Sequence, residues 1–146
     1  MKILKIAIVL ILAFTTTVKA QTAENTIAGT WESDKKDVRL EFFKSGNEYQ
    51  AKLLWGNKIV ESDGKTSKKD AKNPDEKLRS RNIIGIVSVT GLKWDGEEFT
   101  GGKIYNPPSG DTYKCKVWIK DGKLNLRGYM GVSVFGQTAT FHPYNQ

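Results

Sequence analysis

The sequence has little of what most catalytic and metal sites are built from. Its 146 residues include one histidine, His142, and one cysteine, Cys115. A lone histidine at a predicted strand end cannot assemble a multi-histidine metal site or a Ser-His-Asp triad. No glycine-rich phosphate loop opens a helix, and no pair of carboxylates stands out for acid-base work. We therefore expect no cofactor, no bound metal and no enzyme activity.

The single cysteine also excludes an internal disulfide bond, so the stability of the fold has to come from burial. Cys115 falls on the apolar face of a predicted strand. We interpret it as a packed, unreactive thiol; a nucleophile or a dimer-forming cysteine is the alternative. The protein is expected to be a monomer.

Long hydrophobic runs are missing except near the N-terminus. The run from Ile6 to Phe14 follows Lys2 and Lys5, is too short to span a bilayer comfortably, and precedes a small-x-small pattern at 18–20. We predict that residues 1–20 are a secretory signal peptide and that residues 21–146 form a single β-barrel domain. The protein is then periplasmic or secreted, with no membrane span after cleavage. An uncleaved membrane anchor is the alternative.

Acidic residues are fewer than basic ones, 16 against 23. Three lysines belong to the leader, and most of the remaining excess lies in segment 57–82, which has eight basic and five acidic residues. That segment contains no aromatic side chain to stack on a base, so we expect no nucleic-acid partner. We interpret it as a solvated loop, with weak attraction to anionic envelope surfaces as the alternative.

Alternation of apolar and polar residues is the main pattern that is present. In segment 113–120 every second residue is apolar, as in a strand with one buried face. A proline-rich turn precedes it, and Gly101 and Gly102 in the arm before the turn predict a bulge. Turn residues such as Asp121 and Gly122 separate most of the alternating segments. Strands are predicted at 29–31, 38–43, 49–55, 83–89, 99–105, 113–120, 124–128 and 137–142.

Eight short strands joined mostly by tight turns predict an all-β fold. An eight-stranded antiparallel up-and-down barrel is favoured because closure removes exposed strand edges, and an open sandwich is the alternative. The most continuously apolar strand, 83–89, is expected at the centre, packed on both sides. We expect 94–97 to be a turn. The long loop 57–82 is expected to carry a short helical turn with Pro74 at its first position, covering one end of the barrel.

A barrel of eight strands is just wide enough inside to be filled by side chains or to hold one small ligand. If Leu40, Phe42, Leu53, Ile119 and Leu124 fill it, no ligand of useful size can enter. Aromatic and arginine side chains near strand ends are candidates for ligand binding. The alternative is a structural role, in which the aromatic residues pack in the core and the arginines cap strand ends. The candidate ligand-binding residues are Trp31, Arg79, Arg81, Tyr105, Tyr113 and Arg127.

These observations favour an exported, non-catalytic β-barrel that binds a small hydrophobic or amphipathic ligand. The alternative is a structural or protein-interaction module of the cell envelope. That module would use an exposed patch formed by Phe43, Leu54, Trp118 or Tyr129.

Short motifs follow one another in a fixed order between residues 29 and 142. They are Asp70, Asn73-Pro74-Asp75, Leu78-Arg79, Arg81, Gly85, the run 101–107, Gly110, Tyr113, the run 126–129, Gly136 and Thr138. In this order they resemble the bacterial family catalogued as domain of unknown function 2147 (DUF2147). The resemblance implies a small exported protein of a Gram-negative bacterium and brings no biochemical activity with it. Asn106, Asn82 and Phe141 depart from the family, which often has aspartate, proline and tryptophan there.

The opening Gly29-Thr30-Trp31 is similar to the first motif of lipocalin-like barrels. In those barrels a basic residue of the last strand covers the tryptophan. The last strand here has only His142, and Arg127 is a candidate substitute. The resemblance implies a lipocalin-like barrel.

Overall fold

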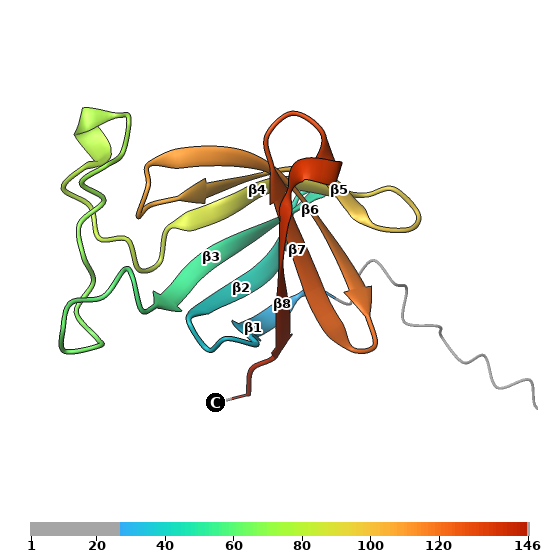
Figure 1. The fold of residues 1–146 in the computed structure, drawn as a ribbon, viewed down its shortest axis with the longest axis horizontal. Helices are drawn as coiled ribbons and strands as arrows, with labels where there is room; N and C mark the ends of the chain where they lie inside the picture. The colour runs from blue at the N-terminus through green and yellow to red at the C-terminus, as the bar shows by residue number, and fades with distance from the viewer. Residues whose placement is uncertain (1–26, 146) are drawn as a thin grey trace, which may run out of the picture.

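The computed structural model describes residues 27–145, and its eight strands form one closed antiparallel barrel in chain order (Figure 1). Each strand pairs with the next, and the last pairs with the first, where Trp31 lies opposite Pro143. This confirms the predicted up-and-down barrel. The strands are β1 (Gly29–Ser33), β2 (Val38–Ser45), β3 (Glu48–Gly56), β4 (Val87–Trp94), β5 (Phe99–Asn106), β6 (Asp111–Lys120), β7 (Lys123–Tyr129) and β8 (Gln137–Pro143).

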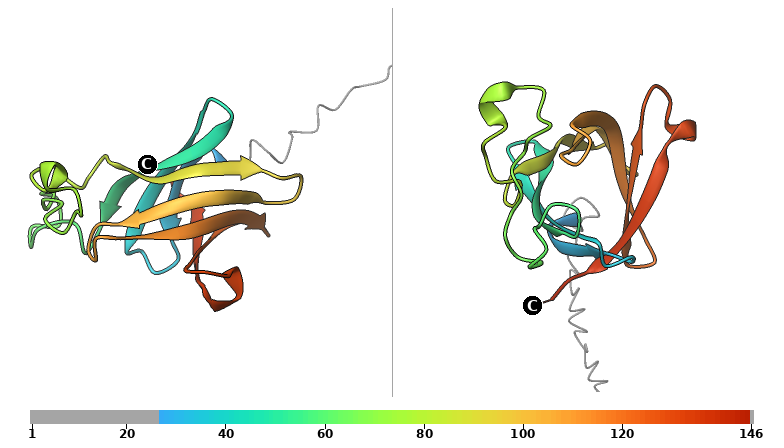
Figure 2. Two further views of the ribbon diagram at one scale, coloured as in Figure 1. Left: turned by 90° about the horizontal axis from the view of Figure 1, so that it is seen from above. Right: turned by 60° about the vertical axis from the view of Figure 1, so that its left-hand side comes forward.

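The connections between strands differ at the two ends of the barrel. Successive strands run in opposite directions, so every second connection belongs to the same end. Connections 34–37, 57–86, 107–110 and 130–136 form one end, which we call the mouth. Short turns form the other end. Two 3-10 turns, η2 (Glu76–Leu78) and η3 (Ser133–Phe135), lie in mouth connections, and these two connections stand on opposite sides of the barrel in the right-hand view of Figure 2.

Aromatic side chains fill the interior away from the mouth. The rings of Tyr49 and Phe99 meet edge to face with centroids 5.2 Å apart, and Trp94 packs on Phe99 at 4.9 Å. Trp31 is buried, and its indole nitrogen donates to the carbonyl oxygen of Ile27 at 2.9 Å. Such packing removes apolar surface from water and fills this part of the interior with side chains.

The glycine pair in β5 forms the predicted bulge. The register between β5 and β6 shifts between Phe99 and Gly102. A Cβ atom on Gly102 would lie 2.6 Å from Leu92 and 2.8 Å from the Cys115 sulfur, so this position has to be glycine. Cys115 is fully buried, and burial raises the pKa of its thiol to about 12. The predicted packing of Cys115 is confirmed, and its lack of reactivity stays a prediction.

The fourth strand differs from the prediction. β4 begins at Val87, extends through Trp94 rather than turning there, and is buried on one face, with Thr90 and Lys93 exposed on the other. Of the apolar residues before it, Ile83 donates its N–H to the Lys68 carbonyl of the loop at 3.0 Å, and the carbonyl of Ile86 accepts from the N–H of Leu53 in β3 at 2.9 Å. These residues are apolar because the loop packs on the barrel. An apolar run alone does not distinguish that kind of burial from a central strand.

Connection 57–86, which we call the mouth segment, is also more ordered than predicted. It is not simply a solvated loop, because Ile59, Val60 and Ile83 are all at most 5% exposed. The expected helical turn is present as η2. It is capped by Asp75, whose side chain accepts from the Lys77 N–H at 3.0 Å, and so begins after Pro74 rather than with it.

Candidate functional site

A cavity of about 260 Å³ opens inside the mouth. Its wall is mostly apolar, and its side chains come from strands on all sides of the barrel and from the mouth segment. Of the residues whose filling of the interior would have excluded a ligand, Leu40 and Leu53 line this cavity, whereas Phe42 and Leu124 are buried in the core. The apolar lining residues are Val38, Leu40, Leu53, Ile59, Ile104, Pro107, Pro108, Leu126, Ala139 and Phe141.

Two small residues, Gly128 and Ala139, leave space in the interior at this end. Leu126 is paired with Ala139 across β7 and β8. Gly128 leaves space beside Ile104, where an added Cβ would have its nearest neighbour at 3.8 Å. Away from the mouth, the rings of Tyr49 and Phe99 pack against each other instead. Gly128 and Ala139 therefore leave room near the mouth, whereas aromatic rings fill the interior further in.

Five polar residues line the cavity, and one of them, Ser88, has a buried hydroxyl. Ser88 is 4% exposed, and within residues 27–145 its hydroxyl is the one buried side-chain oxygen or nitrogen without a hydrogen-bond partner. Nearly all buried polar groups in proteins have a partner, so such a hydroxyl needs an explanation. Lys58 and Asn106 line the same cavity.

A wider hollow of about 1010 Å³ lies outside the cavity and shares part of its lining, including Lys58, Ile104 and Leu126. The hollow is continuous with the cavity through these shared residues. Its own wall is more polar and is bordered by Tyr113 and Phe135. The cavity and the hollow together provide an apolar interior and a polar entrance.

Asp70 ties the mouth segment to β5. It is fully buried, and it accepts hydrogen bonds from the Tyr105 hydroxyl at 2.6 Å, the Asn73 amide at 2.8 Å and Nε of Arg81 at 2.9 Å. Burial alone would raise the pKa of Asp70, but the bonds from Tyr105, Asn73 and Arg81 outweigh it and hold that pKa below its ordinary value. Burial and the bond to Asp70 raise the pKa of Tyr105 to about 12.

A close contact between backbones fixes the same segment to the β5–β6 hairpin. Gly110 has a φ of +82°, and a Cβ built on it would lie 2.2 Å from the Lys72 carbonyl oxygen. Only glycine permits this approach. Because Pro107 and Pro108 of the same hairpin tip line the cavity, the two contacts position one side of the mouth.

The structure places the six residues predicted from the sequence in different parts of the fold. Tyr105 and Arg81 meet at Asp70, and Arg79 donates to the Asn73 carbonyl at 2.8 Å. Tyr113 borders the outer hollow. The remaining two are Trp31, which lies in the core, and Arg127, which binds connection 130–136.

Arg127 therefore does not take the place of the basic residue that covers the tryptophan in lipocalin-like barrels. Its Nε donates to the Ser133 carbonyl at 2.6 Å and its Nη1 to the Thr138 hydroxyl at 2.8 Å. His142, the other candidate, lies beside Glu32 and Asp34, at 3.5 and 3.1 Å.

Sequence reasoning did not single out Ser88 or Lys58. The signal for Ser88 was available, because a serine interrupts the apolar run that ends at Val89. Ile59 and Asn106 line the cavity only because the mouth segment and the hairpin tip pack there. No local sequence pattern predicts that packing.

Two further features bear on function. In the part of the chain that the structure describes, no three histidine, cysteine, aspartate or glutamate side chains gather as a metal site would require. Nor does any helix in residues 27–145 have the length and apolarity to cross a membrane.

The chain is similar in structure to a protein of Helicobacter pylori, HP1028, which is described as belonging to the lipocalin family. The two share 28% sequence identity with a TM-score of 0.72, over 82% of this chain and 83% of that one. No curated protein matches the sequence. The family model described as an uncharacterized protein conserved in bacteria (DUF2147) matches residues 29–142. The motif residues Asp70, Tyr105 and Gly110 are those that hold the mouth segment in place, and the chain belongs to the DUF2147 family, here with a lipocalin-like barrel.

Proposed function

We propose that this protein is an exported, non-catalytic barrel that binds a small, partly apolar ligand in the cavity at its mouth. The observation that carries the proposal is the mostly apolar cavity, which has Ser88 among its lining residues. Ligand sites are typically concave and mostly apolar, with a few polar groups that set orientation. A ligand with one hydrogen-bonding group would satisfy Ser88 and bury its apolar part against Leu40 and Leu126.

The size of the cavity limits the ligand. A volume of about 260 Å³ lies just below the range of roughly 300 to 1,000 Å³ that is usual for small-molecule sites. The apolar part of the ligand is therefore short, and a polar end reaches the outer hollow beside Lys58. The similarity to HP1028, a lipocalin-family protein, supports binding within a barrel of this kind.

Export is the other part of the proposal. It rests on Lys2, Lys5 and the apolar run 6–14, which lie outside the described residues. Fractionation of the native host, followed by mass measurement of the N-terminus, tests it. A mature N-terminus near residue 21 in the periplasm or the medium is expected, and an intact leader in the cytoplasm would contradict export.

Native mass spectrometry of protein purified from its own host tests ligand binding. We expect a retained small-molecule mass on the wild type and none on Ala139→Phe, because Ala139 lines the cavity and is exposed to it. Thr90→Phe is the matched control, since Thr90 is exposed on β4 and does not line the cavity. Wild-type protein that is always empty, or a mass that Ala139→Phe retains, would refute binding at this site.

A further inference from the structure

Connection 130–136, which we call the apolar loop, exposes large hydrophobic side chains to solvent. Val134 and Phe135 are 73% and 83% exposed, and Met130 and Val132 are 73% and 57% exposed. Among the described residues, Val87 at 39% is the one other exposed large hydrophobic side chain. Monomeric proteins seldom gather exposed apolar side chains in this way without a binding role. The residues that we had expected to form an interaction patch, Phe43, Leu54, Trp118 and Tyr129, are each half-buried.

The backbone holds these side chains outward. Arg127 donates to the Ser133 carbonyl at 2.6 Å and to the Val134 carbonyl at 3.0 Å. The N–H of Phe135 donates to the Val132 carbonyl at 3.3 Å, which closes the η3 turn. Gly136 packs so tightly that a Cβ there would lie 2.5 Å from the Gly128 carbonyl oxygen. The exposure of Val134 and Phe135 is therefore built into the loop.

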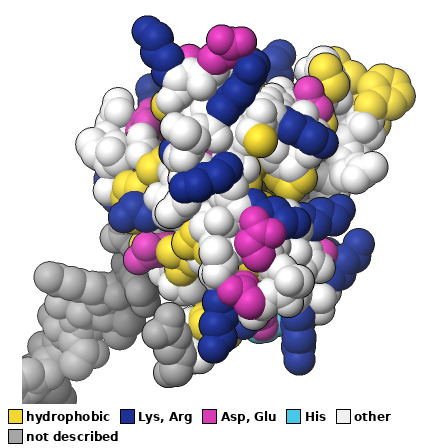
Figure 3. Space-filling view, turned by 90° about the vertical axis from the view of Figure 1, so that its left-hand side faces the viewer, with side chains coloured by type: hydrophobic (Ala, Val, Ile, Leu, Met, Phe, Trp, Pro, Cys, Tyr) yellow, Lys and Arg dark blue, Asp and Glu magenta, His cyan; other side chains and the backbone are white. Residues whose placement is uncertain are grey.

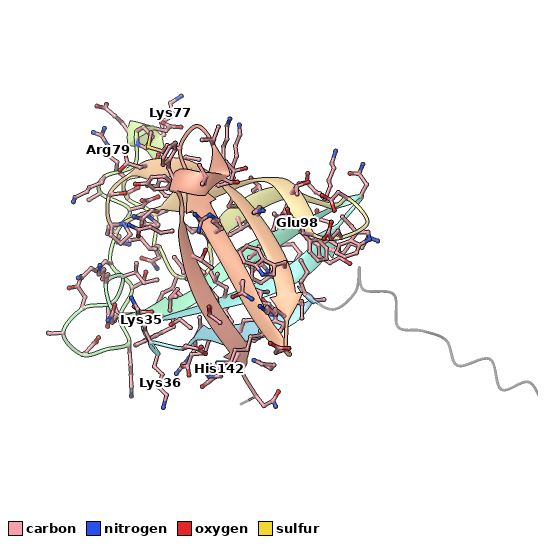
Figure 4. The ribbon with its side chains drawn as sticks, turned by 45° about the vertical axis from the view of Figure 1, so that its right-hand side comes forward. Lys35, Lys36, Lys77, Arg79, Glu98 and His142 are labelled. Carbon is pink, nitrogen blue, oxygen red and sulfur yellow. The ribbon has the colours of Figure 1, made fainter. Side chains whose placement is uncertain are left out.

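The other side of the mouth is basic. The mouth segment holds an excess of three positive charges between residues 57 and 82, and one of its acids, Asp70, is buried and paired with Arg81. Lys77 and Arg79 project outward on the same side of the molecule as Lys35 and Lys36 of the β1–β2 connection (Figure 4). Figure 3 shows many lysine and arginine side chains on this face, interspersed with fewer aspartate and glutamate side chains, and hydrophobic side chains projecting at its upper right edge.

The basic and apolar parts border the same opening. Lys58 of the mouth segment and Met130 and Phe135 of the apolar loop all line the outer hollow. A surface that offers cations beside protruding apolar side chains is complementary to one with anionic groups outside and hydrocarbon beneath. An anionic lipid bilayer has this layering.

We propose that the protein docks its mouth on an anionic lipid bilayer. Val134 and Phe135 enter the interface, and the lysines of the mouth segment contact the lipid headgroups. The barrel then faces its opening toward the bilayer. The proposal does not depend on whether the cavity binds a ligand.

Co-sedimentation with vesicles tests the proposal. Vesicles of phosphatidylethanolamine and phosphatidylglycerol are compared with vesicles of phosphatidylcholine, using the exported chain after its N-terminus has been identified by mass. We expect binding to the anionic vesicles that weakens at high salt and is much weaker on the neutral ones. Equal binding to both kinds of vesicle, or to neither, would overturn the proposal.

Two double variants separate the apolar and the basic contribution. Val134→Ser with Phe135→Ser should lower the partition coefficient on anionic vesicles at least about tenfold, and both residues are exposed enough for the fold to tolerate the change. Lys72→Gln with Lys77→Gln should lower it by roughly tenfold or more at low salt. The matched control is Lys93→Gln with Lys120→Gln, two exposed lysines outside the mouth, which should bind as the wild type does.

A retained leader or a second copy of the chain would show up in the same experiment. An uncleaved apolar leader would bind vesicles whether or not the loop is altered, so unchanged binding by the Val134→Ser, Phe135→Ser variant overturns the proposal.

Sedimentation velocity without lipid tests whether the protein forms a dimer. A dimer that the same variant dissociates would mean that the apolar loop covers a second copy, which also overturns docking on lipid.

Discussion

The Tyr105 hydroxyl donates to a carboxylate oxygen of Asp70 at 2.6 Å, across 35 residues of sequence. This bond joins a strand of the barrel to the middle of the mouth segment, and Asp70 itself is fully buried. Lys72, two residues further along, is held against Gly110 of the β5–β6 hairpin. The Tyr105–Asp70 bond and the Gly110–Lys72 contact therefore both position the side of the cavity formed by Ile59 and the hairpin prolines.

Replacing Tyr105 with phenylalanine should destabilise the protein. The variant removes one of the donors that compensate a buried carboxylate, and bonds to charged groups contribute about 1.5 to 3 kcal/mol. Urea unfolding should show a loss in that range. Tyr113→Phe is the matched control, because the Tyr113 hydroxyl lies at 3.4 Å from Asp111 at an exposed position, and it should change stability by less than about 0.5 kcal/mol. Equal effects from the two variants would mean that the bond to Asp70 contributes little.

The same pair predicts how stability depends on alkaline pH. Burial and Asp70 raise the pKa of Tyr105 to about 12 in the folded protein, whereas an unfolded tyrosine titrates near pH 10. A raised pKa in the folded state stabilises the protein fully below about pH 10, and this contribution is lost as the pH rises toward 12. The difference in unfolding free energy between wild type and Tyr105→Phe should shrink across that interval. A difference that stays constant from pH 9 to 12 would contradict the raised pKa.

The backbone contact at Gly110 predicts a second, independent loss of stability. In Gly110→Ala the new methyl group would lie 2.2 Å from the Lys72 carbonyl oxygen, at a φ of +82°, so the mouth segment has to move. We expect a loss of at least about 2 kcal/mol, together with faster amide hydrogen exchange in residues 68–83. Gly122→Ala is the control. It has a φ of +73° with open space around it, so it should cost about 1 kcal/mol and leave the mouth segment protected.

The sequence predicted the barrel because strands and turns are encoded locally. The alternation at 113–120 indicates which face of the strand is buried, and the Asp121-Gly122 turn indicates that the chain reverses. Eight strands joined in this way have few possible pairings. Gly102 was recognisable for the same reason, since glycine within a strand points to a bulge or a close approach.

The mouth could not be predicted in the same way. Ile83 is apolar because the mouth segment folds back onto the barrel, so its burial depends on contacts with residues far away in sequence such as Lys68. Arg81 and Tyr105 were named only as candidates for ligand binding, because their shared partner, the Asp70 carboxylate, becomes visible only in three dimensions. The apolar loop was overlooked because exposure is a property of the fold, and Phe135 reads in the sequence like any core residue.

Removing the Ser88 hydroxyl should leave the empty protein as stable as before, or more so. An unpaired buried hydroxyl costs stability, by about 1 to 3 kcal/mol, so Ser88→Ala relieves a penalty instead of breaking a bond. Affinity for the cavity ligand should nevertheless fall, by roughly three- to tenfold, if the ligand supplies the missing partner. Thermal unfolding of the ligand-free protein and titration with the ligand recovered from the host measure the two effects.

The two measurements together decide what the hydroxyl does. Ser62→Ala is the control at an exposed position of the mouth segment and should alter neither quantity. If Ser88→Ala instead lowers stability by more than about 1 kcal/mol and leaves affinity unchanged, the hydroxyl is satisfied inside the fold, by an internal water, and serves packing. A gain in stability with a loss of affinity would identify Ser88 as the group that the barrel keeps unpaired for its ligand, because a hydroxyl that only fills space has no reason to produce both changes at once.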